Sequence, residues 1–564
     1  MVEPVVSGVD RNAIPTELFG GNILATRDGV DEDDTYPVIA DALGVEHIRY
    51  PGGALTETYF DIANPDNDRV TDVVTGETLD FLPMSEFMGW AEDTGRSVTL
   101  VLPTRTQLSD ETDDNGERFA AVDEQELRGF LRDTLDGAYG DPQIQAIEIG
   151  NEYWGSGEMS STEYGRVASE MARIVDEELT AHPRADRFAE TDILVQSGKN
   201  FGTADLQPQY ETLGDTRDIL DAIEEDYGVT LDTETYAFLN GEVAWPRVAD
   251  ALIQSEFDET EGAAIDGIVT HLYSKAPANE NSRYFELDTI DLTWQEDRPD
   301  LDTWVTEWNR SDSTALYERG EDYGLDQAHE LLNVVEAMGL ANVEAAHVWP
   351  LQQNTANTLG GEVGEDELTP AGALFAEMQA ALPGTRAVDL NADSRETETS
   401  DGNVDVHMFA APDRMVMYLA NTSDAPESTD VDLSNLVTDP GAVTLTRIGV
   451  AEGEDPNDTE SRAVVTEDPA EEALDGTTLA ADLGPHEILQ AAFDGPAMTE
   501  SFATAVADAS GTAPPDDEDG DDEDGGDGDD SGGDADNSGG DDGGLGIGLG
   551  LLLLLPLLAL GGGG

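Results

Sequence analysis

The sequence predicts an α/β fold: a (β/α)8 TIM barrel followed by a β-sandwich domain and a disordered acidic tail. Between residues 18 and 382, short apolar runs rich in β-branched residues alternate with longer helical segments. From about residue 385 the chain changes to short alternating strands separated by Pro, Gly, Asn and Asp. From about residue 514 it is dominated by Asp, Gly and Ser, a composition that cannot bury enough apolar surface to fold.

The barrel is predicted from eight candidate strands with helical segments between them. The strands are residues 18–25, 46–50, 97–103, 144–150, 192–197, 266–273, 302–308 and 344–350. The helical segments are residues 35–44, 83–95, 123–140, 161–179, 217–228 and 326–341. A doubly wound open sheet is the alternative, but no G-x-G-x-x-G turn follows the first strand, so no dinucleotide site is indicated.

The β-sandwich is predicted from strands of alternating polarity with turn residues between them. They are residues 404–412, 414–422, 428–436, 442–450 and 486–494. A chain of 564 residues is also long enough for two folded units with appendages. The predicted divisions are an N-terminal segment 1–17 that can pair with the sandwich, the barrel 18–382, the sandwich 383–497, a disordered linker 498–544 and an apolar segment 545–564.

The charge balance is extreme, with 123 acidic against 26 basic side chains and a formal net charge of -97. Nucleic acid is excluded as a partner, because phosphate binding requires the opposite sign. Only Lys199 and Lys275 are lysines, and acidic residues occur in every predicted helix, a pattern that indicates a halophilic microbe. Molar salt screens such charges within roughly 3 Å at 1 M.

The absence of cysteine excludes disulfides, thiolate metal ligands and cysteine nucleophiles.

The two ends of the sequence differ in what they indicate about location. No secretory signal is visible at the N-terminus. Near the C-terminus, an acidic spacer with 15 Asp and Glu residues (516–542) precedes the uncharged segment 545–560, whose 16 residues fall short of the roughly 20 that span a bilayer comfortably. We interpret this segment as a membrane anchor or a processing signal, and therefore expect a cell-surface or extracellular protein.

Two glutamates stand where barrel enzymes place catalysis. Glu152 follows the fourth predicted strand within GNEYW, and Glu307 ends the seventh within TEWN. Both fall at the C-terminal ends of their strands, which meet on one face of a barrel. A pair of carboxyls about 5 to 5.5 Å apart is what glycosidic bond cleavage with retention requires, one as acid/base and one as nucleophile.

This placement, with an Asn directly before the first glutamate, resembles the clan A glycoside hydrolases over most of residues 18–382. The surroundings look most like the α-L-arabinofuranosidase family, in FGGN (19–22), RYPGG (49–53), GNEYWG (150–155) and TEWN (306–309). The resemblance implies that Glu152 is the acid/base and Glu307 the nucleophile. The fit is loose outside these motifs, including an acidic insertion at about 275–300, so the family's sugar specificity does not transfer.

The resemblance also implies roles for residues around the two glutamates. Arg49 would support the nucleophile, Asn151 would bond the sugar 2-hydroxyl, and His271 and Tyr273 on the sixth strand would line the site. As a lone barrel histidine, His271 could instead be a core residue or a metal ligand.

The two glutamates are expected to differ in pKa. An arginine beside Glu307 would hold it ionised, whereas Glu152 must be protonated near neutral pH, so their environments should move the two pKa values apart.

Four aromatic residues near the motifs can supply flat faces for sugar stacking or can pack in the core instead. They are Tyr153, Trp154, Trp308 and Trp349.

The sequence thus predicts a retaining glycoside hydrolase that uses no metal and no cofactor and acts on a polysaccharide or oligosaccharide by double displacement. Arabinofuranosides come first as substrates, with β-xylosides, β-glucans or glucuronides next. One alternative is a noncatalytic carbohydrate-binding protein of the cell surface, although binding alone does not need both carboxylates. The other is a structural surface-layer or adhesion protein, which leaves the motifs of residues 18–382 unexplained.

Overall fold

A computed structural model describes residues 1–275, 281–312, 317–318, 320–361, 364 and 366–511. It confirms the predicted fold class. Eight parallel strands close into a barrel in the order β2-β3-β6-β9-β10-β11-β12-β13. They are β2 (Gly20–Asn22), β3 (His47–Tyr50), β6 (Ser97–Leu102), β9 (Gln143–Ile149), β10 (Asp192–Gln196), β11 (Gly267–Ser274), β12 (Asp302–Arg310) and β13 (Val343–Val348). Each lies within two or three residues of its predicted position.

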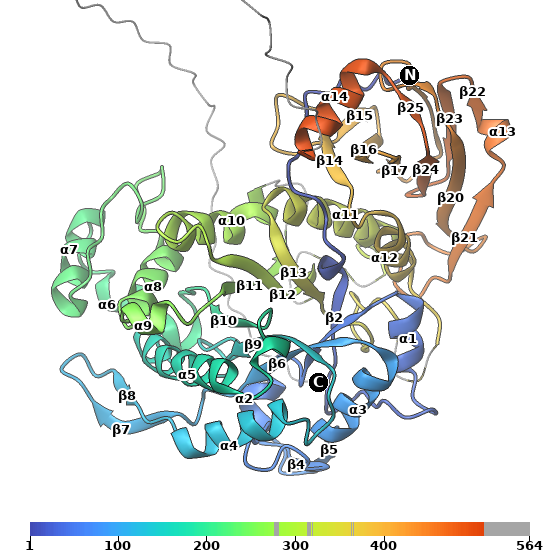
Figure 1. The fold of residues 1–564 in the computed structure, drawn as a ribbon. Helices are drawn as coiled ribbons and strands as arrows, with labels where there is room; N and C mark the ends of the chain where they lie inside the picture. Colours follow the sequence, from blue (N-terminus) through green and yellow to red (C-terminus); the bar gives the residue numbers. More distant parts are fainter. Residues whose placement is uncertain (276–280, 313–316, 319, 362–363, 365, 512–564) are drawn as a thin grey trace, which may run out of the picture. The chain divides into compact units, whose positions relative to one another are not determined.

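Helices follow the barrel strands in the alternating order that the pattern predicts, and Figure 1 shows them around the strands. They are α1 (Tyr36–Ala42), α2 (Leu55–Tyr59), α3 (Met84–Thr94), α4 (Glu124–Leu135), α5 (Ser161–Ala181), α10 (Asn281–Ile290), α11 (Gly324–Leu340) and α12 (Pro370–Ala381). Local sequence fixes several ends. Ser160 and Glu163 form a reciprocal capping box that starts α5, and Gly95 ends α3 in the left-handed conformation.

Several elements were not predicted from the sequence. Two hairpins lie outside the barrel, β4 (Arg69–Thr71) with β5 (Thr78–Asp80) and β7 (Leu108–Thr112) with β8 (Arg118–Ala120). The connection from β10 to β11 carries four helices. Of these, α7 (Thr216–Tyr227) matches the predicted segment 217–228, whereas α6 (Gln207–Tyr210), α8 (Trp245–Gln254) and α9 (Glu259–Gly262) were not predicted. Helices α6, α7 and α8 share an apolar cluster of their own. The acidic insertion after β11 contains α10 and the π-helical turn η4 (Asp291–Gln295). Short 3-10 turns are η1 (Thr16–Phe19), η2 (Ala185–Arg187) and η3 (Gly202–Ala204).

The interior of the barrel changes character along its axis. A separate apolar cluster of Ala146, Leu194, Val269, Trp304 and Ala345 fills it on the side where the strands begin. Farther along the same strands, the buried side chains are polar or charged, including Glu148 and Glu307. Fully buried charges must be paired or hydrogen-bonded, so this second layer is where a functional site is expected.

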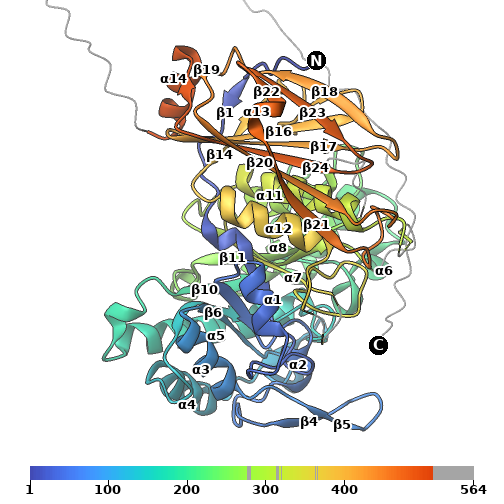
Figure 2. The same ribbon diagram turned by 90° about the vertical axis from the view of Figure 1, so that its right-hand side faces the viewer.

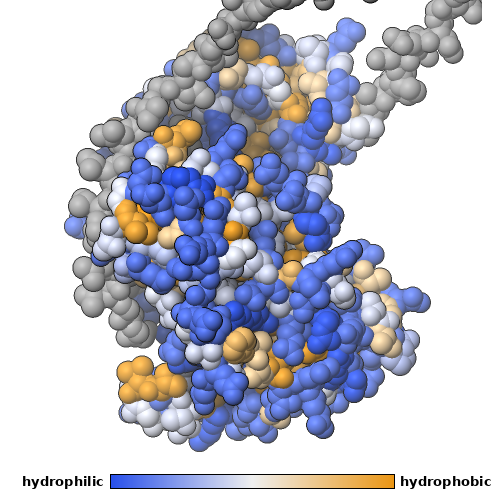
Figure 3. All heavy atoms as spheres, turned by 90° about the vertical axis from the view of Figure 1, so that its left-hand side faces the viewer, coloured by the Kyte–Doolittle hydropathy of each residue, from blue (hydrophilic) through white to orange (hydrophobic). Residues whose placement is uncertain are grey.

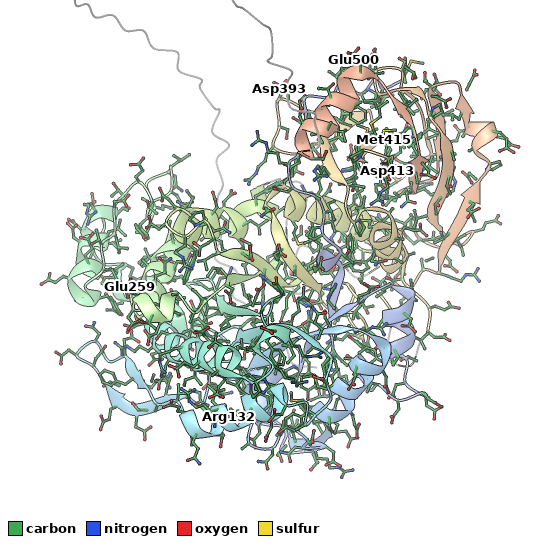
Figure 4. All side chains as sticks on the ribbon, in the orientation of Figure 1. Arg132, Glu259, Asp393, Asp413, Met415 and Glu500 are labelled. Atoms are coloured by element: carbon green, nitrogen blue, oxygen red, sulfur yellow. The ribbon has the colours of Figure 1, made fainter. Side chains whose placement is uncertain are left out.

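The β-sandwich is antiparallel, as predicted. Its larger sheet has the order β1-β14-β16-β17-β24-β20-β21, with β15 paired to β16, and a smaller sheet has the order β18-β23-β22. The strands are β14 (Arg386–Asp389), β15 (Thr399–Asp401), β16 (Val404–Ala411), β17 (Arg414–Asn421), β18 (Glu427–Asp432), β20 (Ala442–Val450), β21 (Ala463–Asp468), β22 (Leu474–Asp475), β23 (Thr478–Leu483) and β24 (Ile488–Asp494). The short pair β19 (Val437–Asp439) and β25 (Ala497–Met498) and the helices α13 (Ala470–Ala473) and α14 (Glu500–Ala509) complete it. Met415, labelled in Figure 4, belongs to its fully buried apolar core.

The sandwich and the barrel belong to one compact unit, residues 1–513. Helices α11 and α12 pack against the larger sheet, and Figure 2 shows them between that sheet and the barrel strands. The N-terminal segment supplies β1 (Gly8–Val9), which pairs with β14. The residue limits given above for the domains stay a prediction.

The predicted acidic spacer and apolar segment lie outside the described residues. Among the residues that the structure describes, none of the helices is long and apolar enough to cross a membrane. Hydrophilic residues dominate the face of the molecule that Figure 3 presents, in keeping with the excess of acidic side chains.

Candidate active site

Glu307 and His271 are neighbours on adjacent strands at the C-terminal edge of the barrel. In the parallel pairing of β11 with β12, Val305 lies opposite Thr270 and Glu307 opposite His271, so Thr306 is an extra residue on β12. The extra residue of this β-bulge changes the direction in which the following side chains of β12 point, and such bulges are common beside functional sites. As a result, the side chains of Glu307 and His271 lie next to each other.

Both carboxyl oxygens of Glu307 accept a hydrogen bond from a buried donor. Its Oε1 accepts a hydrogen bond of 3.0 Å from Arg49 Nη1, and its Oε2 accepts one of 2.8 Å from the Tyr273 hydroxyl. Burial of Tyr273 and the nearby charge of Glu307 raise the pKa of Tyr273 well above its usual value, so its hydroxyl stays a donor. Both oxygens of Glu307 are therefore oriented by fixed donors.

Arg49 is fully buried and contacts four side chains with one guanidinium group. Glu148 accepts from its Nε at 2.7 Å and from its Nη2 at 2.9 Å. Asn22 accepts from Nη1 at 3.0 Å and Asn151 from Nη2 at 2.7 Å. Burial works against the charge, but Glu148 and Glu307 outweigh it and raise the pKa of Arg49. The guanidinium thus fixes Glu307 and Asn151 relative to each other.

Glu152 sits directly after β9 in a strained turn. Its φ of 43° is left-handed, a conformation that few residues other than glycine adopt. Its backbone N–H donates to Gln196 at 3.2 Å, and its side chain is 36% exposed. Strain that the surroundings impose on a residue is common at functional sites, and here it directs an accessible carboxyl toward His271.

The pKa of Glu152 differs from the sequence-based expectation. Burial raises it, but the hydrogen bond between Glu152 Oε1 and His271 Nδ1 (3.2 Å) and the charge of His271 outweigh burial and lower the pKa. His271 is buried, which lowers its own pKa, yet Glu307 and Glu152 together raise it. The contact therefore favours a proton on His271 over one on Glu152.

The two carboxylates are close enough for a displacement with retention. Oxygen atoms of Glu152 and Glu307 and a ring nitrogen of His271 all lie within 4.8 Å of one another. Retaining enzymes hold their carboxyls about 5 to 5.5 Å apart, whereas inverting enzymes leave about 6.5 to 9.5 Å for a water molecule. Such a triad could also hold a cation, but Arg49 and Tyr273 already occupy the oxygens of Glu307.

Asn151 offers a free donor at the same place. Its Oδ1 accepts from Arg49, while its buried Nδ2 has no hydrogen-bond partner among the described residues. Its backbone N–H donates to Glu57 at 2.9 Å, and Glu57 also accepts from Thr104. A buried amide without a partner is costly unless a ligand completes it.

The aromatic residues separate into two groups. Tyr153 and Trp308 are fully buried: Tyr153 stacks on Tyr164, and Trp308 packs beside Phe375. Neither has an exposed face on which a sugar could stack, so we do not count them as substrate contacts. Trp349 is half-buried, and a Cβ added at Gly53 would lie 2.7 Å from its ring and 3.4 Å from Glu307 Oε1.

Trp154 remains next to the site. It is 8% exposed, and its ring meets that of His271 edge-on at 6.3 Å.

Four residues of the site were missed by sequence reasoning. Asn22, Glu57, Glu148 and Gln196 bond the predicted residues or their backbone. Glu148 and Gln196 also bond each other at 2.7 Å. A charged residue between two isoleucines, as in IEI at 147–149, was the available signal for Glu148, because a central barrel strand rarely buries an unpaired charge.

Comparison with known proteins places the fold among carbohydrate-active enzymes. Neither a protein-family model nor a curated protein sequence matches the chain. Solved structures do match it over most of its length, at 11–16% identity, which shows the fold alone.

Three of these structures illustrate the likeness. An α-L-arabinofuranosidase from Thermotoga maritima has a TM-score of 0.55 at 13% identity, covering 87% of this chain and 99% of that one. A family 51 α-L-arabinofuranosidase from Bifidobacterium longum has a TM-score of 0.54 at 16% identity, and the match covers 87% of this chain and 100% of that one. A 4-O-α-L-rhamnosyl-β-D-glucuronidase from Fusarium oxysporum has a TM-score of 0.53 at 11% identity, and the match covers 87% of this chain and 100% of that one. The fold is thus one that glycoside hydrolases share.

Proposed function

We propose that the protein is a retaining glycoside hydrolase that acts on a polysaccharide or oligosaccharide. The observation that carries the proposal is the pair Glu152 and Glu307, whose oxygens approach within 4.8 Å at the C-terminal edge of the barrel. Their surroundings differ as the two roles require: Glu307 is buried between two donors, and Glu152 is accessible and shares a proton with His271.

In the first step, a Glu307 oxygen attacks the anomeric carbon while the bond to the leaving oxygen breaks. The leaving oxygen takes a proton from Glu152, and the sugar becomes an ester of Glu307. Arg49 and Tyr273 keep Glu307 oriented until it attacks. Asn151 Nδ2 is available to bond the sugar hydroxyl next to the anomeric carbon, an interaction that strengthens in the transition state.

In the second step, Glu152 removes a proton from water, which attacks the anomeric carbon and releases Glu307 as a carboxylate. Two inversions at the same carbon give net retention. No step of this scheme needs a cofactor or a metal ion.

The proton for the first step comes from the His271–Glu152 pair. Their contact lowers the pKa of Glu152 and raises that of His271, so we place the proton of the pair on His271 before substrate binds. A leaving oxygen that accepts from Glu152 draws this proton across the 3.2 Å contact, so Glu152 serves as the acid although its own pKa is low.

The sugar is the least constrained part of the proposal. Arabinofuranosides are the first candidates, because chains named as arabinofuranosidases share the fold over most of their length. Glucuronides follow for the same reason, and β-xylosides and β-glucans remain on the panel. Export to the surface of a halophilic microbe, with the segment 545–564 as anchor or processing signal, is proposed from composition alone.

The test is hydrolysis of aryl arabinofuranoside, xyloside, glucoside and glucuronide in molar KCl by the wild type, Glu307→Gln and Glu111→Gln. Glu111 is exposed on hairpin β7–β8 and serves as the matched control. We expect one preferred sugar, wild-type rates for Glu111→Gln and a loss of at least about 10⁴-fold for Glu307→Gln, since the nucleophile has no substitute. A 2-fluoro analogue of the preferred substrate should label Glu307, located by mass spectrometry of peptides.

Two outcomes would contradict the proposal. If Glu307→Gln kept its activity, or if the label appeared elsewhere, Glu307 would not be the nucleophile. If the wild type bound these sugars or polymeric glycans but turned none of them over, the protein would be a carbohydrate-binding protein.

A further inference from the structure

A second cluster of metal-ligand side chains lies between the barrel and the sandwich. Glu336 comes from helix α11, Glu398 directly precedes β15 and His407 lies on β16. One potential ligand atom from each lies within 4.8 Å of the others. Glu336 is 1% exposed, His407 is fully buried and Glu398 is half-buried.

The carboxylates of this cluster lack the donors that buried carboxylates need. Glu336 Oε1 and Glu398 Oε2 are buried and have no hydrogen-bond partner within the described part of the chain. Glu336 Oε2 meets only His407 Nδ1, at 3.0 Å. A buried carboxylate oxygen without a donor is destabilising unless a cation or a proton completes it.

The surrounding charges do not balance these carboxylates. Arg283 forms ion pairs with both Glu330 and Glu396, so its single positive charge is already shared by two acids. Neither Glu336 nor Glu398 forms an ion pair with a lysine or arginine in the described ranges. Neither carboxyl of the cluster therefore has a cationic side chain as partner, and a divalent cation would supply one.

The position of His407 suits a metal ligand that binds through Nδ1. Its other nitrogen, Nε2, lies 3.1 Å from Nε2 of His329. With the Nε2 proton of His407 donated to His329, the Nδ1 lone pair of His407 is free to bind a cation beside Glu336 Oε2, 3.0 Å away. Histidine ligands of metals commonly donate their other N–H in this way.

We propose that Glu336, Glu398 and His407 bind one divalent transition metal ion of the zinc and manganese class, which joins the barrel to the sandwich. Two carboxylates and an imidazole suit these ions better than Ca²⁺ or Mg²⁺, which prefer oxygen alone. The sequence predicted no metal, because the three ligands come from elements far apart along the chain with no metal-binding spacing. The proposal is independent of the catalytic one.

The test measures metal content and thermal unfolding of the full-length protein in molar KCl. The protein is stripped with EDTA, dialysed, incubated with Zn²⁺, Mn²⁺, Ca²⁺ or Mg²⁺, passed through gel filtration and measured by mass spectrometry of the metals. We expect about one Zn²⁺ or Mn²⁺ per chain and a Tm that rises with the concentration of that ion, because a ligand that binds only the folded state stabilises it. Glu336→Gln and Glu398→Gln should each lose the ion and the rise in Tm.

Glu152→Gln is the matched control, since Glu152, His271 and Glu307 form the other triad of ligand atoms. It should retain the ion. The proposal is overturned if the wild type retains neither Zn²⁺ nor Mn²⁺, which would mean that protons satisfy the cluster. It is also overturned if Ca²⁺ or Mg²⁺ binds equally well, or if Glu152→Gln loses the ion while Glu336→Gln keeps it. The wild-type measurement decides even if a variant fails to fold.

Discussion

At the scale of single residues, the two oxygens of Glu307 have separate donors that can be tested one at a time. Tyr273→Phe removes the hydroxyl that donates to Oε2 at 2.8 Å and leaves the ring in place. We expect kcat/KM to fall by about 10- to 100-fold, since a hydrogen bond to a charged group contributes roughly 1.5–3 kcal/mol. Steady-state kinetics on the preferred aryl glycoside measures this.

Tyr50→Phe is the control for that change. Its buried hydroxyl donates to the carbonyl of Leu82 at 2.8 Å and is no partner of Glu307. It should lower thermal stability and leave kcat/KM within about twofold, because a neutral hydrogen bond contributes only about 1 kcal/mol to folding. Equal kinetic losses in both variants would show that the Tyr273 hydroxyl acts through folding and not through Glu307.

The shared proton of His271 and Glu152 predicts a change in pH dependence. Glu307 and Glu152 raise the pKa of His271, so the pair loses its last proton only above the usual histidine range, and activity should fall there as pH rises. In His271→Gln, Glu152 alone must hold the proton, and a single site never binds it more tightly than the pair does. The alkaline limb of kcat/KM should therefore move to lower pH. If the alkaline limb of the kcat/KM profile kept its position, His271 would not be the residue that holds the proton.

Sequence reasoning identified the two glutamates and missed the residues that support them. Glu152 and Glu307 stand out because a motif and a predicted strand end coincide. Asn22 ends β2 and Glu148 lies inside β9, and in neither place does the alternation of side chains along a strand show which neighbour the residue will bond. Proximity in sequence also misled: Trp308 is adjacent to Glu307, but side chains of successive strand residues point to opposite faces. It therefore packs against the helix layer beside Phe375.

At the scale of elements, the turn after β3 limits what can stand beside Glu307. Gly53 has a φ of 49°, and an added Cβ would lie 2.7 Å from the Trp349 ring. Gly53→Ala should therefore reduce kcat/KM by at least about 10-fold and destabilise the fold by roughly 1–3 kcal/mol. Kinetics and thermal unfolding measure the two effects.

Gly76 provides the comparison for Gly53. It has a φ of 73° in the hairpin β4–β5, with nothing within 4 Å of an added Cβ. Gly76→Ala carries the cost of a left-handed alanine, about 1 kcal/mol, without a clash. If both variants lost activity alike, backbone strain and not the space beside Trp349 would be responsible.

The barrel strands could be predicted because buried parallel strands form long apolar runs. The segment SVTLVL at 97–102 is an example: it is apolar and rich in β-branched residues, and six residues are typical of a buried strand. Hairpin β4–β5 could not be predicted, since its strands are three residues each and mostly exposed. The bulge at Thr306 also left no mark in the sequence, because it depends on the register between two strands and not on the composition of either.

At the scale of the whole molecule, the net charge predicts dependence on salt. With 123 acidic and 26 basic side chains, self-repulsion opposes the compact state unless mobile ions screen it. We expect Tm to rise from dilute buffer to molar KCl, followed by circular dichroism. Sucrose serves as the control, because it strengthens burial without screening charge. A Tm that sucrose raised and KCl did not would contradict this account.

The side chain of Asn22 connects the first strand of the barrel to its last. Its Nδ2 donates to carbonyls of Thr306, His347 and Val348, and its Oδ1 accepts from Arg49. Two of those carbonyls belong to β13, the last barrel strand, so Asn22 joins Arg49 on the second strand to the point where the barrel closes. A polypeptide that ended before residue 343 would lack these two acceptors and would leave the Asn22 amide without them.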